Sequence, residues 1–202
     1  MAEKQEVIVF FPLANDVVSD PVSGIWIEIG PNAKKRISDM VDFYSLVYGS
    51  FTKTNHEVWL FAAGTDIRHA KGKTLGTLAY EYFAKEDCFL ETIVNSVDKN
   101  IYGTKPEIIW GVNKVLEKYP PDRFKVAIVL GTQKRHMPRV RTIVSWYCPK
   151  TVDYVFFVTG QTKEIPLWRE GLSWIKLYLG DGKVAELIQK LRRAFPDKFD
   201  QA

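Results

Sequence analysis

Short apolar runs alternate along this chain with longer segments whose apolar residues recur at helical spacing. The clearest run covers residues 125–130 and ends at Gly131. Four similar but less regular runs occupy residues 7–11, 57–63, 91–95 and 152–158. Strands that are apolar on both faces are typical of a parallel sheet that is covered by helices on each side. The pattern therefore predicts such a sheet.

Helical periodicity fills the intervals between these runs. Asn32 is a candidate N-cap, and the apolar residues from Ile37 to Tyr48 after it fall on one stripe. Similar stripes follow in five segments, near residues 75–83, 106–119, 138–147, 165–179 and 184–195. The strand–helix order predicts an α/β fold, a Rossmann-like three-layer sandwich with a mainly parallel sheet of about five strands. We expect one domain over residues 1–202.

Composition excludes several classes of protein. Of the 202 residues, 46% are hydrophobic and 26% are charged, which is ordinary for a globular chain. No apolar run approaches the roughly 18 residues of a membrane span, and the amino-terminal run is too short for a secretory signal. We therefore expect a cytoplasmic protein with no membrane partner. The net charge of +4 is too small to indicate nucleic acid, whereas the basic cluster at residues 134–141 suits a small anion.

Familiar catalytic and metal-binding motifs are missing from the sequence. The two cysteines, Cys88 and Cys148, form no C-x-x-C pair and no ligand spacing with the three histidines, so we expect free thiols and no metal site. Neither G-x-G-x-x-G nor G-x-x-x-x-G-K-[ST] occurs, which disfavours dinucleotide and P-loop sites. There is also no G-x-S-x-G elbow of an α/β hydrolase.

Polar residues follow four of the predicted strands. Ligands of open parallel sheets bind beyond the carboxyl ends of the strands, so these residues are expected to converge on one edge. In chain order the sets are Asn15 and Asp16; Gly64, Thr65 and Asp66; Asn95, Ser96, Asp98 and Asn100; and Thr132, Gln133, Lys134, His136 and Arg139.

The fourth set is the most informative. Gly131 lets the backbone approach a ligand, and the helix that follows offers unpaired N–H groups to an anion. His136 and Arg139 are three residues apart and would share one face of the first helical turn. Arg139 would grip a phosphate or carboxylate, and His136 would donate to it or act as acid or base. The alternative is that the basic side chains are solvated and His136 only caps the turn.

The segment around these two residues resembles a known family, the bacterial YdcF/SanA/ElyC-like proteins. Their fourth strand ends in a pattern close to V-T-S-x-x-H-x-x-R-A, and this chain has His-Met-Pro-Arg at residues 136–139. A Ser-Gly-Gly-like turn of the family is similar to Ala63-Gly64-Thr65, and an arginine of its first helix to Arg36. Its N-T-x-E-N-like segment is similar to residues 100–107, with Thr104 and Glu107 as counterparts.

The resemblance implies a Rossmann-like fold and a site at the strand ends. One member of the family binds S-adenosylmethionine, so that cofactor or a phosphorylated metabolite is the implied ligand. We therefore expect binding of a small anionic or nucleotide-like ligand, with transferase or phosphoesterase activity as the catalytic options. The alternative is a non-catalytic regulatory or protein-interaction module on the same scaffold. The candidate catalytic residues are His136 and Arg139, and the candidate ligand-binding residues are Asn15, Arg36, Gly64, Thr65, Asp66, Thr104 and Thr132.

Overall fold

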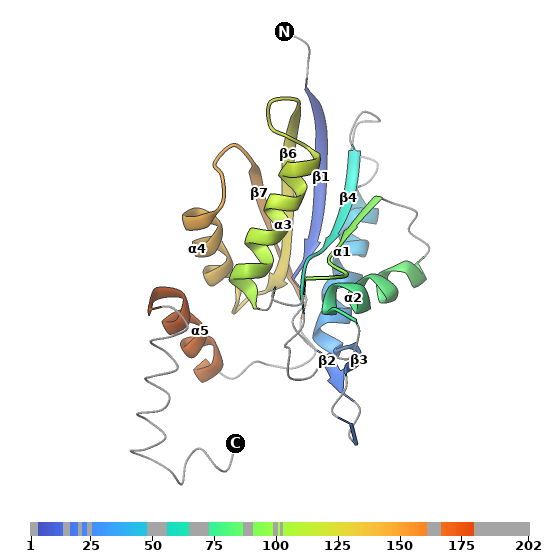
Figure 1. Ribbon diagram of the computed structural model, residues 1–202, viewed down its shortest axis with the longest axis vertical. Helices are drawn as coiled ribbons and strands as arrows, with labels where there is room; N and C mark the ends of the chain where they lie inside the picture. Colours follow the sequence, from blue (N-terminus) through green and yellow to red (C-terminus); the bar gives the residue numbers. More distant parts are fainter. Residues whose placement is uncertain are drawn as a thin grey trace. The chain divides into compact units, whose positions relative to one another are not determined.

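The computed structural model of the chain is shown in Figure 1. It describes residues 4–13, 17–19, 22–23, 26–47, 56–64, 73–86, 91–98, 101, 103–160 and 167–179. The chain forms two compact units, Met1–Lys163 and Glu164–Ala202. Within the described residues, no helix has both the length and the apolar character needed to cross a membrane.

The first unit is built around an open sheet of five parallel strands. In chain order these strands are β1 (Gln5–Pro12), β4 (His56–Phe61), β5 (Glu91–Val94), β6 (Phe124–Gln133) and β7 (Asp153–Thr159). Across the sheet their order is β5-β4-β1-β6-β7, so the first strand of the chain lies in the middle. All five apolar runs of the sequence form strands of this sheet, which confirms the predicted Rossmann-like α/β fold.

Four helices of the first unit connect these strands. They are α1 (Pro31–Val47), α2 (Leu75–Phe83), α3 (Thr104–Lys118) and α4 (Met137–Tyr147), and a short 3₁₀ helix, η2 (Ala84–Glu86), extends α2. The predicted N-cap of α1 is wrong, because Asn32 lies one residue inside the helix and is buried. In the second unit the structure describes α5 (Leu167–Leu179), which confirms the helix predicted near residues 165–179. The helix predicted at 184–195 lies outside the described residues.

Helices α1 and α2 pack on one face of the sheet through a cluster of aromatic side chains. The rings of Phe10 on β1 and Trp59 on β4 stack with centroids 5.1 Å apart. Tyr44 of α1 meets the Phe10 ring edge-on at 5.4 Å. All three residues are buried. Burying aromatic rings removes large apolar areas from water, so this cluster fixes α1 against the central strands.

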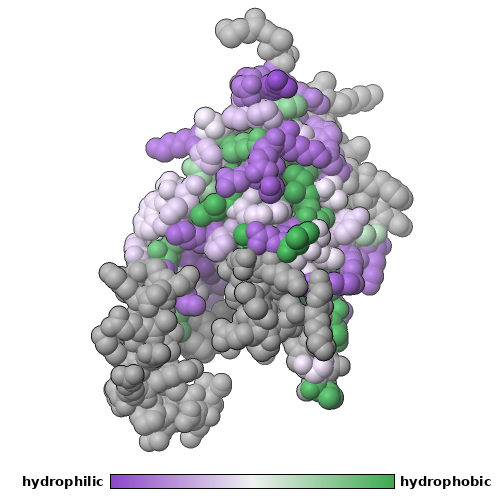
Figure 2. Space-filling view, in the orientation of Figure 1, coloured by the Kyte–Doolittle hydropathy of each residue, from purple (hydrophilic) through white to green (hydrophobic). Residues whose placement is uncertain are grey.

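Helices α3 and α4 cover the opposite face, with α3 in front of the sheet in Figure 1. Gly111 of α3 lies directly over β1 and β4, because a Cβ atom there would come within 2.7 Å of the Phe11 ring and 2.9 Å of Leu60. On the face drawn in Figure 2, hydrophilic areas alternate with smaller hydrophobic ones over the described residues. This mixed surface is typical of helices whose outer sides meet water.

A small antiparallel sheet interrupts the path from β1 to α1. Its strands are β2 (Val17–Ser19) and β3 (Trp26–Ile29), with Val17 opposite Ile29. The sequence pattern does not reveal this pair, because a three-residue strand gives no alternation to detect. The insertion leaves the sheet at the carboxyl end of β1 and returns at the start of α1.

Candidate functional site at the carboxyl edge of the sheet

The strand order reverses between β1 and β6, which places the site that parallel sheets usually offer to ligands at their carboxyl ends. The chain leaves β1 toward β4 on one side and leaves β6 toward β7 on the other. Just beyond β1, the amide of Leu13 donates to the carbonyl of Gly131 on β6 at 3.0 Å. The two central strands therefore stay paired up to the point where their loops diverge.

His136 and Arg139 are brought together at this edge, as their spacing predicted. Strand β6 ends at Gln133, and the amide of His136 closes the following turn by donating to the Gln133 carbonyl at 3.0 Å. Helix α4 then begins at Met137, with a proline in its first turn. The guanidinium Nη2 of Arg139 lies 3.0 Å from Nδ1 of His136, and both side chains are buried.

This contact sets the tautomer of the histidine. An arginine side chain only donates, so Nδ1 of His136 must accept the hydrogen bond from Arg139. The imidazole proton is then on Nε2, which makes Nε2 a donor. A cationic guanidinium and an imidazole N–H at the start of one helix are suited to bind an anion. The alternative reading of His136 as a simple cap is not supported, since its side chain makes no capping hydrogen bond to α4.

Arg36 reaches the same edge from the other face of the sheet. It lies in the first half of α1, is 2% exposed, and donates from Nη1 to the carbonyl of Leu13 just after β1. Burial of a guanidinium is costly unless its charge is compensated, so the position requires polar partners. Arg36 was a candidate only through the family resemblance. Its side chain lies beside the end of β1 and so belongs to this edge of the sheet.

Thr132, Thr104 and Glu107 lie on the side of the sheet that α3 and α4 cover. Thr132 is the neighbour of Gly131 on β6 and is buried. Thr104 is the first residue of α3 and follows Gly103, whose φ of 93° favours glycine. Glu107, in the first turn of α3, is 1% exposed. A carboxylate there complements the partial positive charge of the helix N-terminus.

Gly131 and Gly64 are explained by packing within the protein. A Cβ on Gly131 would overlap the sulfur of Met40 in α1, so this glycine gives room to α1 rather than to the ligand we expected. A Cβ on Gly64 would come within 2.7 Å of the carbonyl oxygen of Asp98. The Gly64 amide also donates to the carbonyl of Ile101, and its own carbonyl accepts from Leu75 at 3.1 Å. At Gly64 the backbone is therefore in close contact with other backbone segments of the protein, and not with the ligand site we expected there.

The polar residues at the end of β5 also serve the fold. The side-chain nitrogen of Asn95 donates to the carbonyls of Ala62 and Asp98 at 2.9 and 2.8 Å, and its oxygen accepts from the Asp98 amide at 2.9 Å. Thr74 caps α2 by accepting from the Thr77 amide at 3.1 Å and donates to the Asn95 carbonyl. Three of the residues selected as candidate ligand contacts, Asn15, Thr65 and Asp66, lie outside the described residues.

Three charged side chains are buried at this edge within the described part of the first unit. They are Arg36, Arg139 and Glu107, and the histidine His136 is buried with them. Taking a charge out of water is costly unless polar groups compensate it, so buried positions of this kind depend on polar contacts. The edge therefore gathers cationic and hydrogen-bonding side chains where parallel sheets bind ligands.

Two buried polar side chains at this edge were not among the candidate catalytic or ligand-binding residues. Gln133 ends β6 and Thr159 ends β7, and the two residues are paired across the strands. Gln133 is 0% exposed and Thr159 is 4% exposed. Among the described residues, neither the amide nitrogen or oxygen of Gln133 nor the hydroxyl of Thr159 has a hydrogen-bond partner. The polar set after the fourth strand included Gln133, but Thr159 had no signal beyond its place at a strand end.

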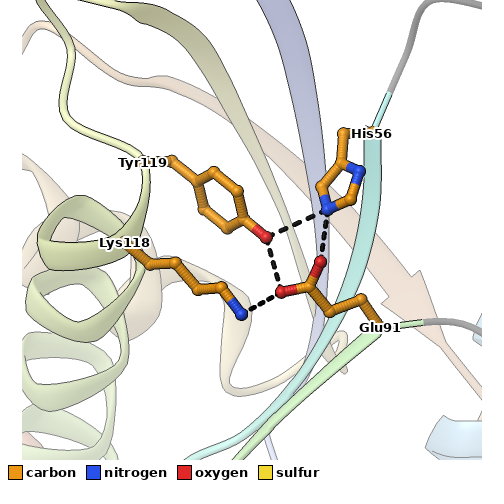
Figure 3. Close-up of polar contacts among 4 residues, drawn as sticks. All are labelled: His56, Glu91, Lys118 and Tyr119. Atoms are coloured by element: carbon orange, nitrogen blue, oxygen red, sulfur yellow. Dashed lines mark hydrogen bonds and ion pairs between the residues drawn. The ribbon is translucent and has the colours of Figure 1, made fainter.

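A second polar cluster lies at the opposite, amino-terminal edge of the sheet (Figure 3). His56 and Glu91 are the first residues of β4 and β5, and they pair with each other. Tyr119, just after α3, donates to Glu91 at 2.7 Å and lies 3.0 Å from Nε2 of His56, while Lys118 forms an ion pair with Glu91. The cluster fastens the carboxyl end of α3 to two strands.

The carboxylate of Glu91 is strongly favoured in its charged form. Partial burial raises the pKa of Glu91, but the hydrogen bonds from Lys118, Tyr119 and His56 outweigh this effect and lower it to about 2. Burial and the neighbouring carboxylate both raise the pKa of Tyr119 above its usual value. A group that is anchored in this way supports structure better than proton transfer near neutral pH.

Metal chemistry and thiol chemistry find little support in the described residues. No three His, Cys, Asp or Glu side chains among them are grouped so that they could hold a metal ion. Cys148 is a free, half-buried thiol, and burial raises its pKa to about 11. At neutral pH it is therefore protonated and a poor nucleophile. Cys88 lies outside the described residues.

Comparison with known proteins does not identify a function for this edge of the sheet. No family model, no curated protein and no solved structure matches it.

Proposed function

We propose that this protein binds a small anionic ligand at the carboxyl edge of its sheet, where β1 and β6 diverge. The observation that carries the proposal is the contact between two buried side chains at the start of α4, where the guanidinium of Arg139 lies 3.0 Å from Nδ1 of His136. The site lies at the reversal of strand order, where open α/β sheets bind ligands. A phosphate or carboxylate group would accept hydrogen bonds from the guanidinium and the imidazole.

Each basic residue has a defined part in this proposal. The guanidinium of Arg139 supplies the charge and a fork of N–H donors. His136 supplies its Nε2–H, because Nδ1 is occupied by Arg139. Arg36 approaches from the α1 side at the end of β1. The resemblance to YdcF-like proteins supports the same location and adds S-adenosylmethionine and phosphorylated metabolites as ligand classes.

Binding without turnover is favoured over catalysis by one feature of the histidine. In catalytic dyads a carboxylate usually accepts from the second imidazole nitrogen and makes the first one basic. Here Arg139 donates to that second nitrogen, so the proton stays on Nε2, which is a hydrogen-bond donor and not a base. The Nε2–H can still donate a hydrogen bond to a leaving oxygen, so phosphoesterase activity is the catalytic alternative. Release of p-nitrophenol from p-nitrophenyl phosphate, lost in His136→Gln, would establish that alternative.

Calorimetric titration with inorganic phosphate and with S-adenosylmethionine tests the binding site. Loss of a charge-assisted contact is typically about 1.5–3 kcal/mol, so Arg139→Met is expected to weaken phosphate binding by roughly 10- to 100-fold. Arg139→Lys retains the charge without the fork and is expected to fall between Met and the parent.

Arg141 provides a matched control on the same helix. Its side chain is exposed and lies over the ring of Phe156 at 5.2 Å. Arg141→Met removes a charge of the same kind two positions further along the helix. This variant is expected to bind phosphate as the parent does. Thermal unfolding of all three variants verifies that they are folded. Absence of anion binding by the parent, or equal weakening in Arg139→Met and Arg141→Met, would overturn the proposed function.

A further inference from the structure

We infer that Gln133 and Thr159 form a second subsite of the same edge, which takes the neutral, hydrogen-bonding end of the ligand, of the kind that a nucleobase presents. The inference rests on the proposed function, because it assigns the other end of the proposed anionic ligand. It is carried by a different observation, the three buried polar atoms of these two residues that have no partner among the described residues.

The two side chains point to the face of the sheet that α1 covers. A Cβ on Gly131 would meet Met40 of α1, and residues two apart on a strand share a face, so Gln133 points to the same side. On β7, the ring of Phe157 packs on Phe43 of α1 with centroids 4.6 Å apart. Thr159, two residues further on, therefore points to that side as well. Two separate contacts thus place both residues under α1.

Helix α1 closes over the end of β7 beside this pair. The carboxylate of Asp39 accepts from the backbone amide of Gly160 at 2.6 Å, and Lys35 forms an ion pair with Asp39. A Cβ on Gly160 would come within 3.1 Å of Cε of Lys35 and 3.2 Å of the carboxylate of Asp39, so α1 lies close to the backbone here. The neighbouring charges are thus satisfied by each other and by the backbone. The polar atoms of Gln133 and Thr159 stand apart in having no such partner among the described residues.

Leaving these atoms without partners is costly for the free protein. A buried polar group without a hydrogen bond typically costs about 1–3 kcal/mol, so apolar side chains of the same shape would suit a purely structural position better. Met and Val would fill the space of Gln and Thr without that cost. Polar residues that a fold does not need are expected where a ligand supplies the missing partner.

The chemistry of the pair fits the edge of a base. A glutamine amide presents one donor and one acceptor side by side, which matches the adjacent donor and acceptor of adenine. The hydroxyl of Thr159 can donate or accept beside it. Adjacent strands lie about 4.8 Å apart, so the ends of β1 and β7, with β6 between them, are separated by about 10 Å. That span suits a nucleotide, with the phosphate near Arg36 at the end of β1 and the base reaching Thr159 at the end of β7, beside Gln133.

The test compares three probes on the parent and on Gln133→Met and Thr159→Val. Inorganic phosphate reports the anion site alone, adenosine the neutral subsite alone, and adenosine 5′-monophosphate both. We expect the monophosphate to bind the parent at least tenfold more tightly than phosphate does. Gln133→Met should lower affinity for the monophosphate at least tenfold more than it lowers affinity for phosphate. Gln5→Met, at the exposed start of β1, is the matched control and should change neither.

Stability provides a second readout. If the amide of Gln133 serves a ligand, Gln133→Met should leave the melting temperature unchanged or raise it, since an unpartnered polar group is removed. A lower melting temperature in Gln133→Met together with unchanged nucleotide binding would show that the amide serves the fold through bound water, and would overturn the inference.

The outcomes separate the inference from the proposed function. Equal affinity of the parent for phosphate and the monophosphate, unaffected by Gln133→Met, would sink the subsite and leave the anion site standing. Binding of adenosine that depends on Gln133, with no binding of phosphate, would sustain the subsite and overturn the anion site. Binding of none of the three probes would overturn both.

Discussion

Glu91 shows at the scale of a single residue how one carboxylate can hold several elements. It accepts from Tyr119 and pairs with Lys118 and His56, so a strand end and a helix end meet on one side chain. Most surface ion pairs contribute about 0–1 kcal/mol, because each pairs two flexible side chains in water. Glu91 differs because three partners from two other elements converge on it.

Replacing Glu91 by glutamine is expected to destabilise the protein by about 1–2 kcal/mol at pH 7, since hydrogen bonds to the charged form are lost. The pKa of Glu91 is lowered to about 2, so its contribution is present above the usual carboxyl range and lost as pH falls from about 4.5 toward 2. Urea unfolding of the parent and Glu91→Gln at pH 7, 4.5 and 2.5 measures the difference, which should shrink as pH falls.

Glu6 offers the matched comparison. Among the described residues it pairs with the exposed Lys125, at 2.6 Å, so Glu6→Gln should change stability by less than about 0.5 kcal/mol. Equal effects of the two substitutions at pH 7, or a Glu91→Gln difference that does not depend on pH, would contradict the assigned role of the cluster.

Residue spacing predicted part of the candidate site and missed the rest for a physical reason. His136 and Arg139 lie in one helical turn, so their contact follows from a separation of three positions. Gln133 and Thr159 are adjacent only because β6 and β7 are neighbours in the sheet. That adjacency depends on strand order, which the apolar runs do not encode. The buried state of the amide is also invisible in the sequence.

At the scale of elements, two glycines within helices differ in how closely other atoms surround them. Gly111 lets α3 lie close to the sheet, because a Cβ would press on Phe11 and Leu60. For Gly171 in α5, no atom of the described residues lies within 4 Å of the position of an added Cβ. Glycine weakens a helix by about 1 kcal/mol relative to alanine, so Gly111 is retained for packing, whereas the described residues place no such constraint on Gly171.

Alanine substitution should therefore act with opposite sign at the two positions. Gly111→Ala is expected to destabilise the first unit by about 1–3 kcal/mol, since overpacking outweighs the gain in helix propensity. Gly171→Ala should increase the helicity or stability of the second unit by up to about 1 kcal/mol. Circular dichroism with thermal unfolding measures both. A stabilising Gly111→Ala would show that α3 does not approach the strands this closely.

Elements were predicted well where they are long and poorly where they are short. The run at residues 125–130 lies within β6, and the stripe from Ile37 to Tyr44 lies within α1. The pairing of β2 with β3 went undetected, because three residues carry too little pattern. Asn32 was assigned outside α1 although it lies inside, since a capping residue type does not fix which residue starts the helix.

At the scale of the whole molecule, the sheet and its helices account for the first unit alone. The buried cluster that joins Phe10, Trp59 and Tyr44 consists entirely of residues before position 160. A unit with its own core is expected to fold by itself. The sequence predicted a single domain over residues 1–202, and the two compact units, Met1–Lys163 and Glu164–Ala202, make that prediction testable.

A chain that ends at Lys163 is expected to unfold cooperatively and to keep the circular dichroism of an α/β fold, because the core of the first unit remains complete. Its melting temperature should fall by no more than about 5 °C, the equivalent of roughly 1–2 kcal/mol. Urea unfolding of the full chain is the reference. A truncated chain without a cooperative transition would show that residues 1–202 fold as one domain.

The loops after β4 and β5 are joined to each other by several hydrogen bonds, and this has a consequence for how the edge can move. Gly64 is bonded to Ile101, Thr74 to the Asn95 carbonyl, and Asn95 to Ala62. These bonds hold the loops after β4 and β5 together, so this half of the carboxyl edge is expected to move as one piece. Adaptation of the edge to a ligand is therefore expected to leave this half in place, and the incoming molecule would be positioned against it.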